Sequence, residues 1–427
     1  MKNKILQILY DLRHQPVISG VTLIGTALTI FLIMIVVMIQ QIPVLPFAPE
    51  SNRPRLLLGC NMHLETLEKS GPSGIRVAGL SYNAARKFYE NLEGVSYISY
   101  FQQYAQKEDV KGPTGKLFLA NGRRADADFF KIFDHTILKG RFYTREEADA
   151  MENVAVVAET TAFKLFGDSD PIGQTFQYGF KPYRVVGVIK DNSPLATLGS
   201  GDVFIPTSQN DVYMSFEEYR GQTAVAILAK PGVDFSSIRD QVKARYAALN
   251  TELAEEGWEA IYHEQPYDIE TVAFAVTSGN NTPDLESVKK SRYLIFVILL
   301  LVPAINLSSM LHSRMRRRIS EIGVRRAFGC TRSRIILDII SENFLITLAG
   351  GILGLILGII VGINYAALYD TVQNVGKGGT PALSMMFNWT ILLTALGVCF
   401  VLNIISAAVP AWQASRVNVV DAINANK

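Results

Sequence analysis

The feature that most constrains this chain is a set of long apolar runs near its two ends. The first run, residues 17–42, contains no charged residue. It exceeds the roughly 7–15 residue apolar core of a signal peptide, and as a helix it is long enough to cross about 30 Å of hydrocarbon. Further runs occupy residues 293–311, 344–363 and 390–409. We therefore predict four transmembrane helices, although Pro303 and Asn306 interrupt the second.

Prolines mark the end of the first predicted span. Pro43, Pro46 and Pro49 follow it at intervals of three residues. Because proline lacks a backbone N–H and disfavours helix in the preceding residue, we expect the helix to end near Gln41. The same prolines argue against a continuous stalk helix that would extend from the membrane.

The basic residues that flank the spans predict the orientation of the chain. They are concentrated in residues 1–16, in residues 312–334 and in the tail 410–427, whereas the loop 364–389 carries one lysine. We therefore expect both termini and the 312–334 segment to be cytoplasmic. Residues 43–290 and the 364–389 loop are then outside the membrane. This is the arrangement of a multi-pass membrane protein with a large external domain.

The region 43–290 is long enough to bury a core of its own. Residues 81–92 have helical amphipathicity, residues 94–101 alternate like a strand, and residues 223–230 read as a short buried strand. A later helix places Ile238, Val242, Tyr246 and Leu249 on one face. Short strands between Gly and Pro turns, with 184–189 the best defined, predict an inserted, mostly β subdomain at about 115–205. The predicted class is a four-span α-helical membrane protein with an α+β external domain of helix-backed antiparallel strands.

Enzymatic motifs are missing from the sequence. It has no GxSxG or HExxH motif, and its five histidines and three cysteines are scattered. The glycines of GPTGK at 112–116 lack the spacing of a phosphate-binding loop, and no Ser or Thr follows the lysine. We therefore expect a non-catalytic chain that binds no metal or cofactor. If ATP and Mg²⁺ are used, another polypeptide must bind them.

Small residues recur within the third predicted span. Gly350, Gly354, Gly358 and Gly362 are spaced by four and share one helical face, where another backbone can approach closely. The contact could be packing within the chain or an interface between subunits, and the sequence favours neither.

An arginine-rich segment joins the second and third spans. Arg314, Arg316, Arg317 and Arg318 directly follow the second span, where they can anchor it to anionic lipid headgroups. The following stretch, 320–329, has the sequence pattern of a capped helix. Its serine can cap a helix, its acid suits the positive helix end, and Gly329 can end the turn. Such a helix is typical of docking into a groove on a partner protein. Nucleic-acid binding is disfavoured, since the segment is tethered at the bilayer and has few stacking aromatics.

Several motifs together resemble MacB-type, FtsX-like permeases of ABC transporters. The cytoplasmic motif is SEIGVRRAFGCTRSRI. The external motifs are DADFFKIFDHTILKGRFYTREE, VAVVAETTAFKLFGDSDPIGQTF and YRVVGVIKD, and the closing motif is PAWQASRVNVVDAI. The resemblance covers nearly the whole chain. It departs from the family pattern at Val419, where a proline is often found.

The resemblance implies a partner ATPase and a mechanical role. It places a coupling helix at Glu321, Ile322, Gly323, Arg325, Arg326, Phe328 and Gly329. It also implies that two permease chains, identical or different, assemble with two ATPase chains that bind ATP and Mg²⁺. ATP-driven closure would then move the periplasmic domains, a mechanism called mechanotransmission. MacB-type members use a periplasmic adaptor and an outer-membrane channel for export.

Two alternatives to export stay open at this stage. Related members of the family release lipoproteins or regulate a periplasmic hydrolase. A membrane-anchored sensor belongs to a different class of protein, but it would need a separate output protein, because the cytoplasmic segments are short.

Overall fold

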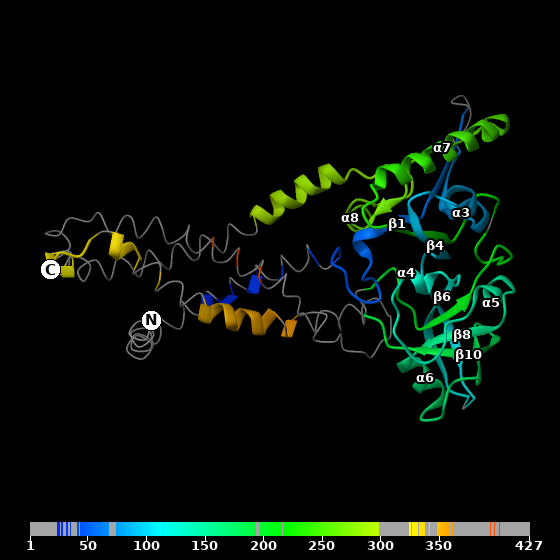
Figure 1. Cartoon of the computed structure of the whole chain (residues 1–427), viewed down its shortest axis with the longest axis horizontal. Coiled ribbons are helices and arrows are strands. Elements are labelled where there is room, and N and C mark those ends of the chain that lie inside the picture. Colours follow the sequence, from blue (N-terminus) through cyan, green and yellow to red (C-terminus); the bar gives the residue numbers. More distant parts are fainter. Residues whose placement is uncertain are drawn as a thin grey trace. The chain divides into compact units, whose positions relative to one another are not determined.

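The computed structural model describes residues 43–298, apart from residues 68–73, 114, 194–195 and 216, together with scattered positions in 24–41 and 324–401. The chain forms two compact units (Figure 1). One consists of Pro43–Val288 with Ala366–Ala382, and the other comprises the remaining segments. We call Pro43–Val288 the core domain.

The four predicted spans lie largely outside the described residues. Every described position within these spans is helical, including the continuous stretch 348–358. Among the residues that the structure describes, no helix is both long enough and apolar enough to cross a bilayer. The expectation of four transmembrane helices therefore stays a prediction.

The core domain is built on a sheet of fifteen strands. Its main path runs β11-β8-β10-β9-β5-β6-β4-β13-β3-β2-β14, and four further strands pair beside this path. The strands are β1 (Leu56–Gly59), β2 (Met62–Thr66), β3 (Ile75–Leu80), β4 (Val95–Gln102), β5 (Gln106–Lys111), β6 (Leu117–Ala125), β7 (Ile137–Gly140), β8 (Val154–Ala158), β9 (Thr175–Tyr178), β10 (Lys181–Ile189), β11 (Val203–Pro206), β12 (Arg220–Gly221), β13 (Thr223–Ala229), β14 (Trp258–Ala260) and β15 (Tyr267–Asp268).

Short and long helices cover this sheet. Figure 1 shows α3 and α7 at one end of the core domain, α6 at the other, and α4 between them. The helices are η1 (Arg53–Arg55), α3 (Tyr82–Tyr89), α4 (Phe129–Ile132), α5 (Arg145–Asp149), α6 (Glu159–Phe166), α7 (Phe235–Leu253), η2 (Ala254–Glu256) and α8 (Ile269–Phe274). A further helix follows at 285–298.

The α+β half of the core domain confirms several predictions made from periodicity. Helix α3 forms within residues 81–92, where helical amphipathicity was predicted, and the side chain of Ser81 caps it by accepting from the Ala84 N–H. Helix α7 buries Ile238, Val242, Tyr246, Leu249 and Leu253 on one face. Tyr246 stacks on Phe88 of α3 with ring centroids 4.2 Å apart. Burial of each apolar side chain of this size stabilises the folded chain by about 1.5–3 kcal/mol.

Strand β13 explains why its sequence is apolar without alternation. All seven of its residues are buried. The strand pairs with β1 on one side and β4 on the other, and both pairings are antiparallel. A central strand covered on both faces has no solvent-facing positions for polar residues.

The region predicted as a mostly β insert, about 115–205, contains helices α4, α5 and α6 as well as strands. Its first strand, β6, pairs with β5 in a hairpin. Strand β10 runs parallel to β8, and β11 runs parallel to β6, so the strands are not all antiparallel. Strands brought together by crossover connections can pair in parallel. The prediction of antiparallel strands concerned the α+β half, and there β13 pairs antiparallel with β1, β3 and β4, as β2 does with β3 and β14. A buried aromatic cluster around Phe101, Phe129, Phe133 and Phe204 packs between the insert and the α+β half.

Candidate functional site: the N-terminal linker clamp

The segment that joins the first apolar run to the core domain is not helical. We call residues 43–55 the N-terminal linker. Residues 43–52 form turns, one bend and irregular backbone, and the 3-10 helix η1 follows immediately. This agrees with the predicted effect of Pro43, Pro46 and Pro49, since proline ends helices and favours extended or turn backbone. The linker instead lies against the core domain through a buried ion pair.

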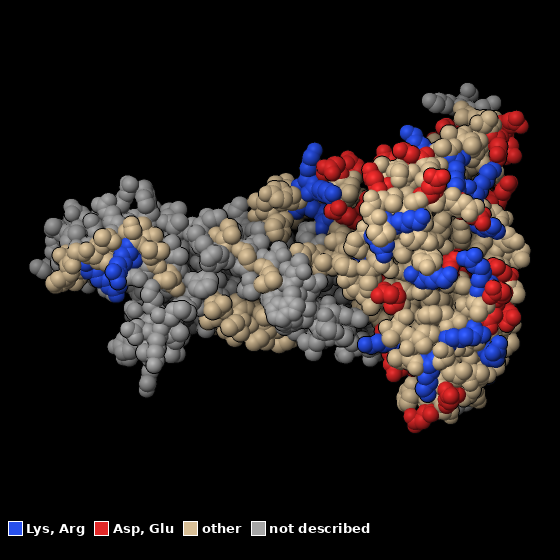
Figure 2. All heavy atoms as spheres, in the orientation of Figure 1, with Lys and Arg blue, Asp and Glu red and all other residues tan. Residues whose placement is uncertain are grey.

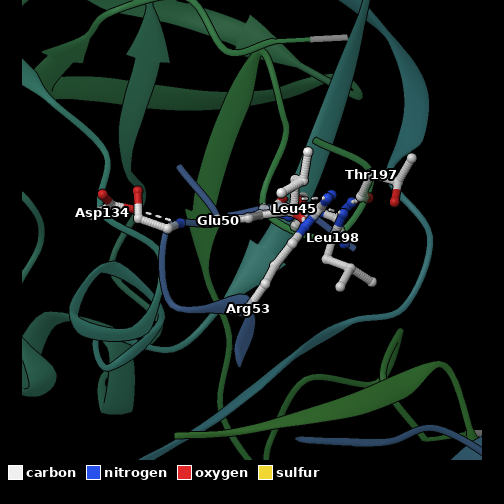
Figure 3. Close-up of polar contacts among 9 residues, drawn as sticks. Leu45, Glu50, Arg53, Asp134, Thr197 and Leu198 are labelled. Atoms are coloured by element: carbon white, nitrogen blue, oxygen red, sulfur yellow. Dashed lines mark hydrogen bonds and ion pairs between the residues drawn. The ribbon is translucent and has the colours of Figure 1, made fainter. Parts of the chain in front are cut away.

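Glu50 and Arg53 form that ion pair (Figure 3). Arg53 donates from Nε to Glu50 Oε2 at 2.7 Å, and its Nη2 lies 2.6 Å from the same oxygen. The residues are 1% and 4% exposed. Arg53 also donates from Nη1 to the Leu45 carbonyl at 3.0 Å and stacks over the Phe47 ring at 4.2 Å. These contacts fold the linker back on itself.

The second oxygen of Glu50 binds a loop of the insert. Oε1 accepts from the N–H groups of Leu198 and Gly199, each at 2.8 Å. These residues lie between β10 and β11, 148 and 149 positions away in the chain. Position 199 requires glycine for close approach, because a Cβ there would lie 2.8 Å from Phe133 and 3.2 Å from Pro49. Both carboxylate oxygens of Glu50 are thus supplied with donors, which offsets the cost of burying the charge.

Arg123 of β6 holds the same loop from the other side. It donates to the Thr197 carbonyl at 3.2 Å and to the Ser200 carbonyl at 3.0 Å. It also donates to the Gln102 carbonyl at the end of β4 at 2.9 Å. Burial lowers the pKa of Arg123 to about 10, and the nearby charge of Glu50 opposes that shift. The guanidinium is therefore a cation at neutral pH, fixed by backbone carbonyls of two segments.

A second set of contacts ties the linker to the last residue of α4 and to the residues after it. The Ser51 N–H donates to Asp134 Oδ1 at 3.2 Å, and the Asp134 N–H donates to the Pro49 carbonyl at 2.9 Å. The Asn52 amide donates to the Ile132 carbonyl at 2.9 Å. Figure 3 shows Asp134 at the opposite end of this group of contacts from Thr197 and Leu198. We call Glu50, Arg53, Arg123 and the loop 197–200 the linker clamp.

The linker clamp fastens the N-terminal linker to the core domain through buried polar contacts. Its charged groups pair with one another or with backbone. In the part of the chain that the structure describes, no group of three or more His, Cys, Asp or Glu residues could hold a metal ion. Breaking a buried ion pair costs about 3–5 kcal/mol. A displacement of the linker is therefore expected to carry the loop with it.

The face of the core domain that Figure 2 shows has no large patch of charged side chains of one sign. Lys and Arg side chains alternate there with Asp and Glu. Recognition of a polyanion requires basic side chains gathered on one face or along one groove. The face in view is not of that kind.

The predicted coupling segment is described only in part. Residues 324–325 and 327 are helical, and Gly329 has a φ of +88° that ends the turn. The Phe328 N–H donates to the Val324 carbonyl at 3.1 Å, and its side chain is 88% exposed. Glu321, Ile322, Gly323 and Arg326 lie outside the described residues, as do the predicted lipid-anchoring arginines 314–318. The coupling and anchoring roles stay predictions.

The glycine face of the third predicted span is also described in part. Gly350, Gly354 and Gly358 lie in the helix 348–358 and are buried, whereas Gly362 falls outside the described residues. On the same helix Ile352 and Ile356 are 55% and 48% exposed. Which surface approaches the glycines stays a prediction.

Sequence reasoning missed the linker clamp. A glutamate and an arginine three positions apart, among prolines and directly after an apolar run, were the available signal. Neither residue belongs to a repeating pattern. The loop that Glu50 binds had no recognisable motif.

Two family models match this chain. The model of a MacB-like periplasmic core domain matches residues 19–245, and that of an FtsX-like permease C-terminal domain matches residues 293–419. These matches place the chain in the class of membrane permeases that carry an extracytoplasmic core domain. More narrowly, the chain belongs to the MacB/FtsX family of ABC transporter permeases.

Curated relatives are similar at low identity. A macrolide export ATP-binding/permease protein MacB of Bdellovibrio bacteriovorus is 24% identical over 302 residues, which are 67% of this chain and 41% of the relative. An uncharacterized ABC transporter permease YknZ of Bacillus subtilis is 23% identical over 67% of this chain and 65% of its own length. A probable syringafactin export ATP-binding/permease protein SyfD of Pseudomonas syringae is 23% identical over 84% of this chain and 52% of its own length. The matched part thus spans 41% to 65% of these relatives.

Solved structures of periplasmic or extracellular domains also match. The periplasmic region of MacB from Actinobacillus actinomycetemcomitans is 17% identical, with a TM-score of 0.33 over 47% of this chain and 87% of that chain. The extracellular domain of YknZ from Gram-positive bacteria is 15% identical, with a TM-score of 0.32 over 47% of this chain and 100% of that chain.

Proposed function

We propose that this chain is the permease subunit of a MacB-type ABC transporter. A separate ATPase hydrolyses ATP, and the permease transmits the resulting movement to its core domain. The movement drives export of a substrate from the periplasm across the outer membrane. Membership of the permease family supports the proposal, as do the export proteins among the relatives.

The observation that carries the proposal is the linker clamp. It begins a few residues after the first apolar run and ends on the central strands of the sheet. Glu50 links the linker to the loop 197–200, and Arg123 links that loop to β4 and β6. A pull on the first span therefore reaches the insert through buried charge-assisted hydrogen bonds.

The other end of the core domain is attached differently. We call residues 276–284 the C-terminal linker, which precedes the helix 285–298. Gly279 packs so closely against β3 that a Cβ would lie 2.5 Å from the Val77 Cγ1 atom. The Thr282 hydroxyl lies 2.9 Å from Nδ1 of His263. The N-terminal linker contacts the loop 197–200 and β13, whereas the C-terminal linker contacts β3 and His263. Because these attachment points differ, relative movement of their spans would deform the core domain.

The remaining parts of the proposal concern assembly. Two permease chains bind two ATPase chains through the segment 312–334, and the ATPases hold ATP and Mg²⁺. Four spans cross a bacterial inner membrane with both termini in the cytoplasm. A periplasmic adaptor and an outer-membrane channel complete the export path.

The docking part is tested by charge reversal in the predicted coupling helix. The full chain is co-purified with a candidate ABC ATPase, and Glu321→Lys is compared with Glu252→Lys in the core domain. We expect Glu321→Lys to abolish co-purification and to reduce coupled ATPase activity at least tenfold, with Glu252→Lys unchanged. Association that survives Glu321→Lys and Gly323→Pro would contradict the docking role.

The transmission part is tested by Glu50→Gln in the same complex. Glutamine keeps the size of the side chain but removes the charge that binds Arg53 and the loop 197–200. Hydrogen exchange of peptides covering 196–200 is measured with and without ATP in lipid nanodiscs. We expect the ATP-dependent difference to vanish while association with the ATPase is kept.

The matched control is Glu252→Gln. Glu252 also forms an ion pair, with Lys87 at 2.6 Å, but its side chain is 61% exposed. An exposed pair contributes only about 0–1 kcal/mol. The control should therefore keep the ATP-dependent difference, and an unchanged difference in Glu50→Gln would argue against transmission through the clamp.

A further inference from the structure

The first half of β6 forms an open edge of the sheet. Strand β5 pairs with residues 117–122 on one side of β6. The other partners of β6, which are β11 and β4, pair with it only from residue 122 onward. Within the part of the core domain that the structure describes, residues 117–121 therefore have a neighbouring strand on one side only.

The main-chain groups of Leu117 and Leu119 point toward the open side. The Asn121 N–H donates to Asp202 Oδ2 at 2.9 Å, and the Asn121 carbonyl accepts from the Asp202 N–H at 2.7 Å. The main-chain groups of Asn121 thus face away from β5. In an antiparallel pair, residues two positions apart turn these groups to the same side. The N–H and carbonyl groups of Leu117 and Leu119 therefore also face away from β5, and they bond to no other described segment.

The leucine side chains of this edge are exposed, while the strand itself is held in place. Leu117 is 61% and Leu119 is 63% exposed. Phe118, between them, points to the other face of the sheet and packs against a buried cluster that includes Leu165 of α6. The turn before β6 also lies against α6, because a Cβ on Gly112 would be 2.5 Å from the Leu165 carbonyl oxygen. The open edge is therefore a fixed part of the fold.

Exposed strand edges are usually protected against pairing with another chain by charged side chains or proline. Two other edge strands follow that rule. Among the described strands, β7 pairs only with β10 and carries the exposed Lys139, and β14 pairs only with β2 and carries the exposed Glu259. The open edge of β6 carries two exposed leucines instead, which favours pairing.

The open edge is complementary to a second copy of itself. When two copies meet with their β6 strands antiparallel, about a two-fold axis between their Phe118 residues, Leu117 of one copy lies opposite Leu119 of the other. The outward N–H and carbonyl groups then form two hydrogen bonds in each of the two leucine pairs. The four leucine side chains lie on one face of the joined sheet, where opposite residues are close enough to pack.

The charges beside this edge also suit a second copy. Asp109 of β5 pairs with Leu119, and Lys111 pairs with Leu117. In the joined sheet, each row across the four strands begins with Lys111 of one copy, continues through two leucines and ends with Asp109 of the other. Opposite charges therefore flank the leucines in both rows, and like charges do not face one another.

We propose that two copies of this chain join their core domains edge to edge through residues 117–119 of β6. The proposal rests on the assembly of two permease chains in the proposed function. Four leucines and four hydrogen bonds supply only a small part of the about 1,200–2,000 Å² that a stable interface between free proteins buries. The pairing therefore needs the high effective concentration that an assembled dimer provides. Within that dimer it makes the two sheets continuous.

The test is a disulfide between two differently tagged full-length chains. One chain carries Leu117→Cys and the other Leu119→Cys, and both are co-expressed, purified by the two tags in succession and oxidised in lipid nanodiscs. Opposite residues of a hydrogen-bonded pair have Cα atoms about 5.5 Å apart, a separation that suits a disulfide. We expect a disulfide that joins positions 117 and 119, identified by mass spectrometry. Because both leucines are exposed, the substitutions leave the core intact.

Two control pairs test the register. With Leu117→Cys on both chains, the two-fold axis places the Cα atoms about 8 Å apart, beyond the reach of a disulfide. Leu138→Cys with Leu119→Cys tests exposure alone, because Leu138 is 43% exposed on β7. We expect both control pairs to give a disulfide yield lower by about tenfold. Equal yields would mean random collision and would overturn the proposal.

Recovery by both tags reports the assembly of two chains independently of the disulfide. Recovered pairs that form no disulfide between positions 117 and 119 would overturn the edge pairing and leave the proposed function standing. Failure of the two tagged chains to co-purify would overturn both the edge pairing and the proposed assembly of two identical chains. A disulfide specific to positions 117 and 119 in the recovered pairs would support the proposal.

Discussion

Glu50, Arg53 and Arg123 show what buried charge contributes at the scale of single residues. Well-packed apolar side chains in their place could be equally stabilising. The charged groups, however, accept only partners at hydrogen-bond distance and angle. Glu50 therefore binds the N–H groups of Leu198 and Gly199 and not an adjacent loop. The clamp therefore fixes the N-terminal linker in one position on the core domain.

Cys60 provides a prediction at the same scale. Burial raises the pKa of its thiol to about 12, and the residue is 8% exposed. The thiolate is the reactive form, so an alkylating reagent at pH 8 should leave Cys60 unmodified in the native chain. The more accessible Cys330 should react. Peptide mapping by mass spectrometry distinguishes the two.

The raised pKa of the Cys60 thiol makes the free energy of unfolding depend on pH. Between pH 9 and pH 12 the unfolded thiol ionises and the folded thiol does not. The contribution of Cys60 is complete below pH 9 and falls by up to about 1.4 kcal/mol per pH unit above it. Cys60→Ala should remove this part of the slope in urea unfolding followed by pulse proteolysis. Fast labelling of native Cys60 would count against both expectations.

At the scale of elements, local sequence patterns and helix caps account for many of the helices and strands that form. Helix α5 is only five residues long, yet it has a complete capping box. The Glu147 N–H donates to the Thr144 hydroxyl at 3.2 Å, and the Thr144 N–H donates to Glu147 Oε2 at 2.8 Å. Hydrogen bonds from Arg141 lower the pKa of Glu147 to about 2. A short helix depends on such terminal contacts because it has few internal ones.

We predict that Thr144→Ala lowers the free energy of unfolding by about 1 kcal/mol. Thr144→Ser keeps the hydroxyl and should be nearly neutral. Urea unfolding of the full chain, monitored by pulse proteolysis, measures both. In wild type the contribution of Glu147 is present above pH 4.5 and is lost as pH falls toward 2. Equal effects of the two substitutions would mean that the cap does not stabilise α5.

Elements of the α+β half were predictable and those of the insert less so. Helix α7 repeats its apolar residues every three or four positions over five turns. This periodicity is visible in the local sequence and predicts the helix. The parallel pairings of β8 with β10 and of β6 with β11 have no such local signal. They depend on the path of the connecting segments.

At the scale of the whole molecule, the third predicted span suggests how the chain packs. We predict that Gly354→Leu with Gly358→Leu disrupts a close helix contact, because leucine side chains would separate the two backbones. Light scattering of the chain in detergent measures the oligomeric state, and thermal unfolding measures stability. If the glycines lie at a subunit interface, the double variant should have a lower mass than wild type. If they make an intrachain contact, it should have a lower melting temperature at unchanged mass.

Ile356→Leu is the control for this double substitution. Ile356 lies on the same helix but is 48% exposed, and the change conserves volume. It should alter neither mass nor melting temperature. A double glycine variant with wild-type mass, stability and function would show that the glycines make no close contact.

The sequence by itself determined the division of the chain into apolar runs and one large domain, and also the main helices and strands of the α+β half. These features repeat along contiguous residues, so their physical cause is local. The tertiary structure decided where the two linkers attach. Glu50 meets Leu198 across 148 positions, and His63 meets His263 across 200. Whether a charged or titratable side chain is buried depends on partners that only folding brings together, and no local periodicity records them.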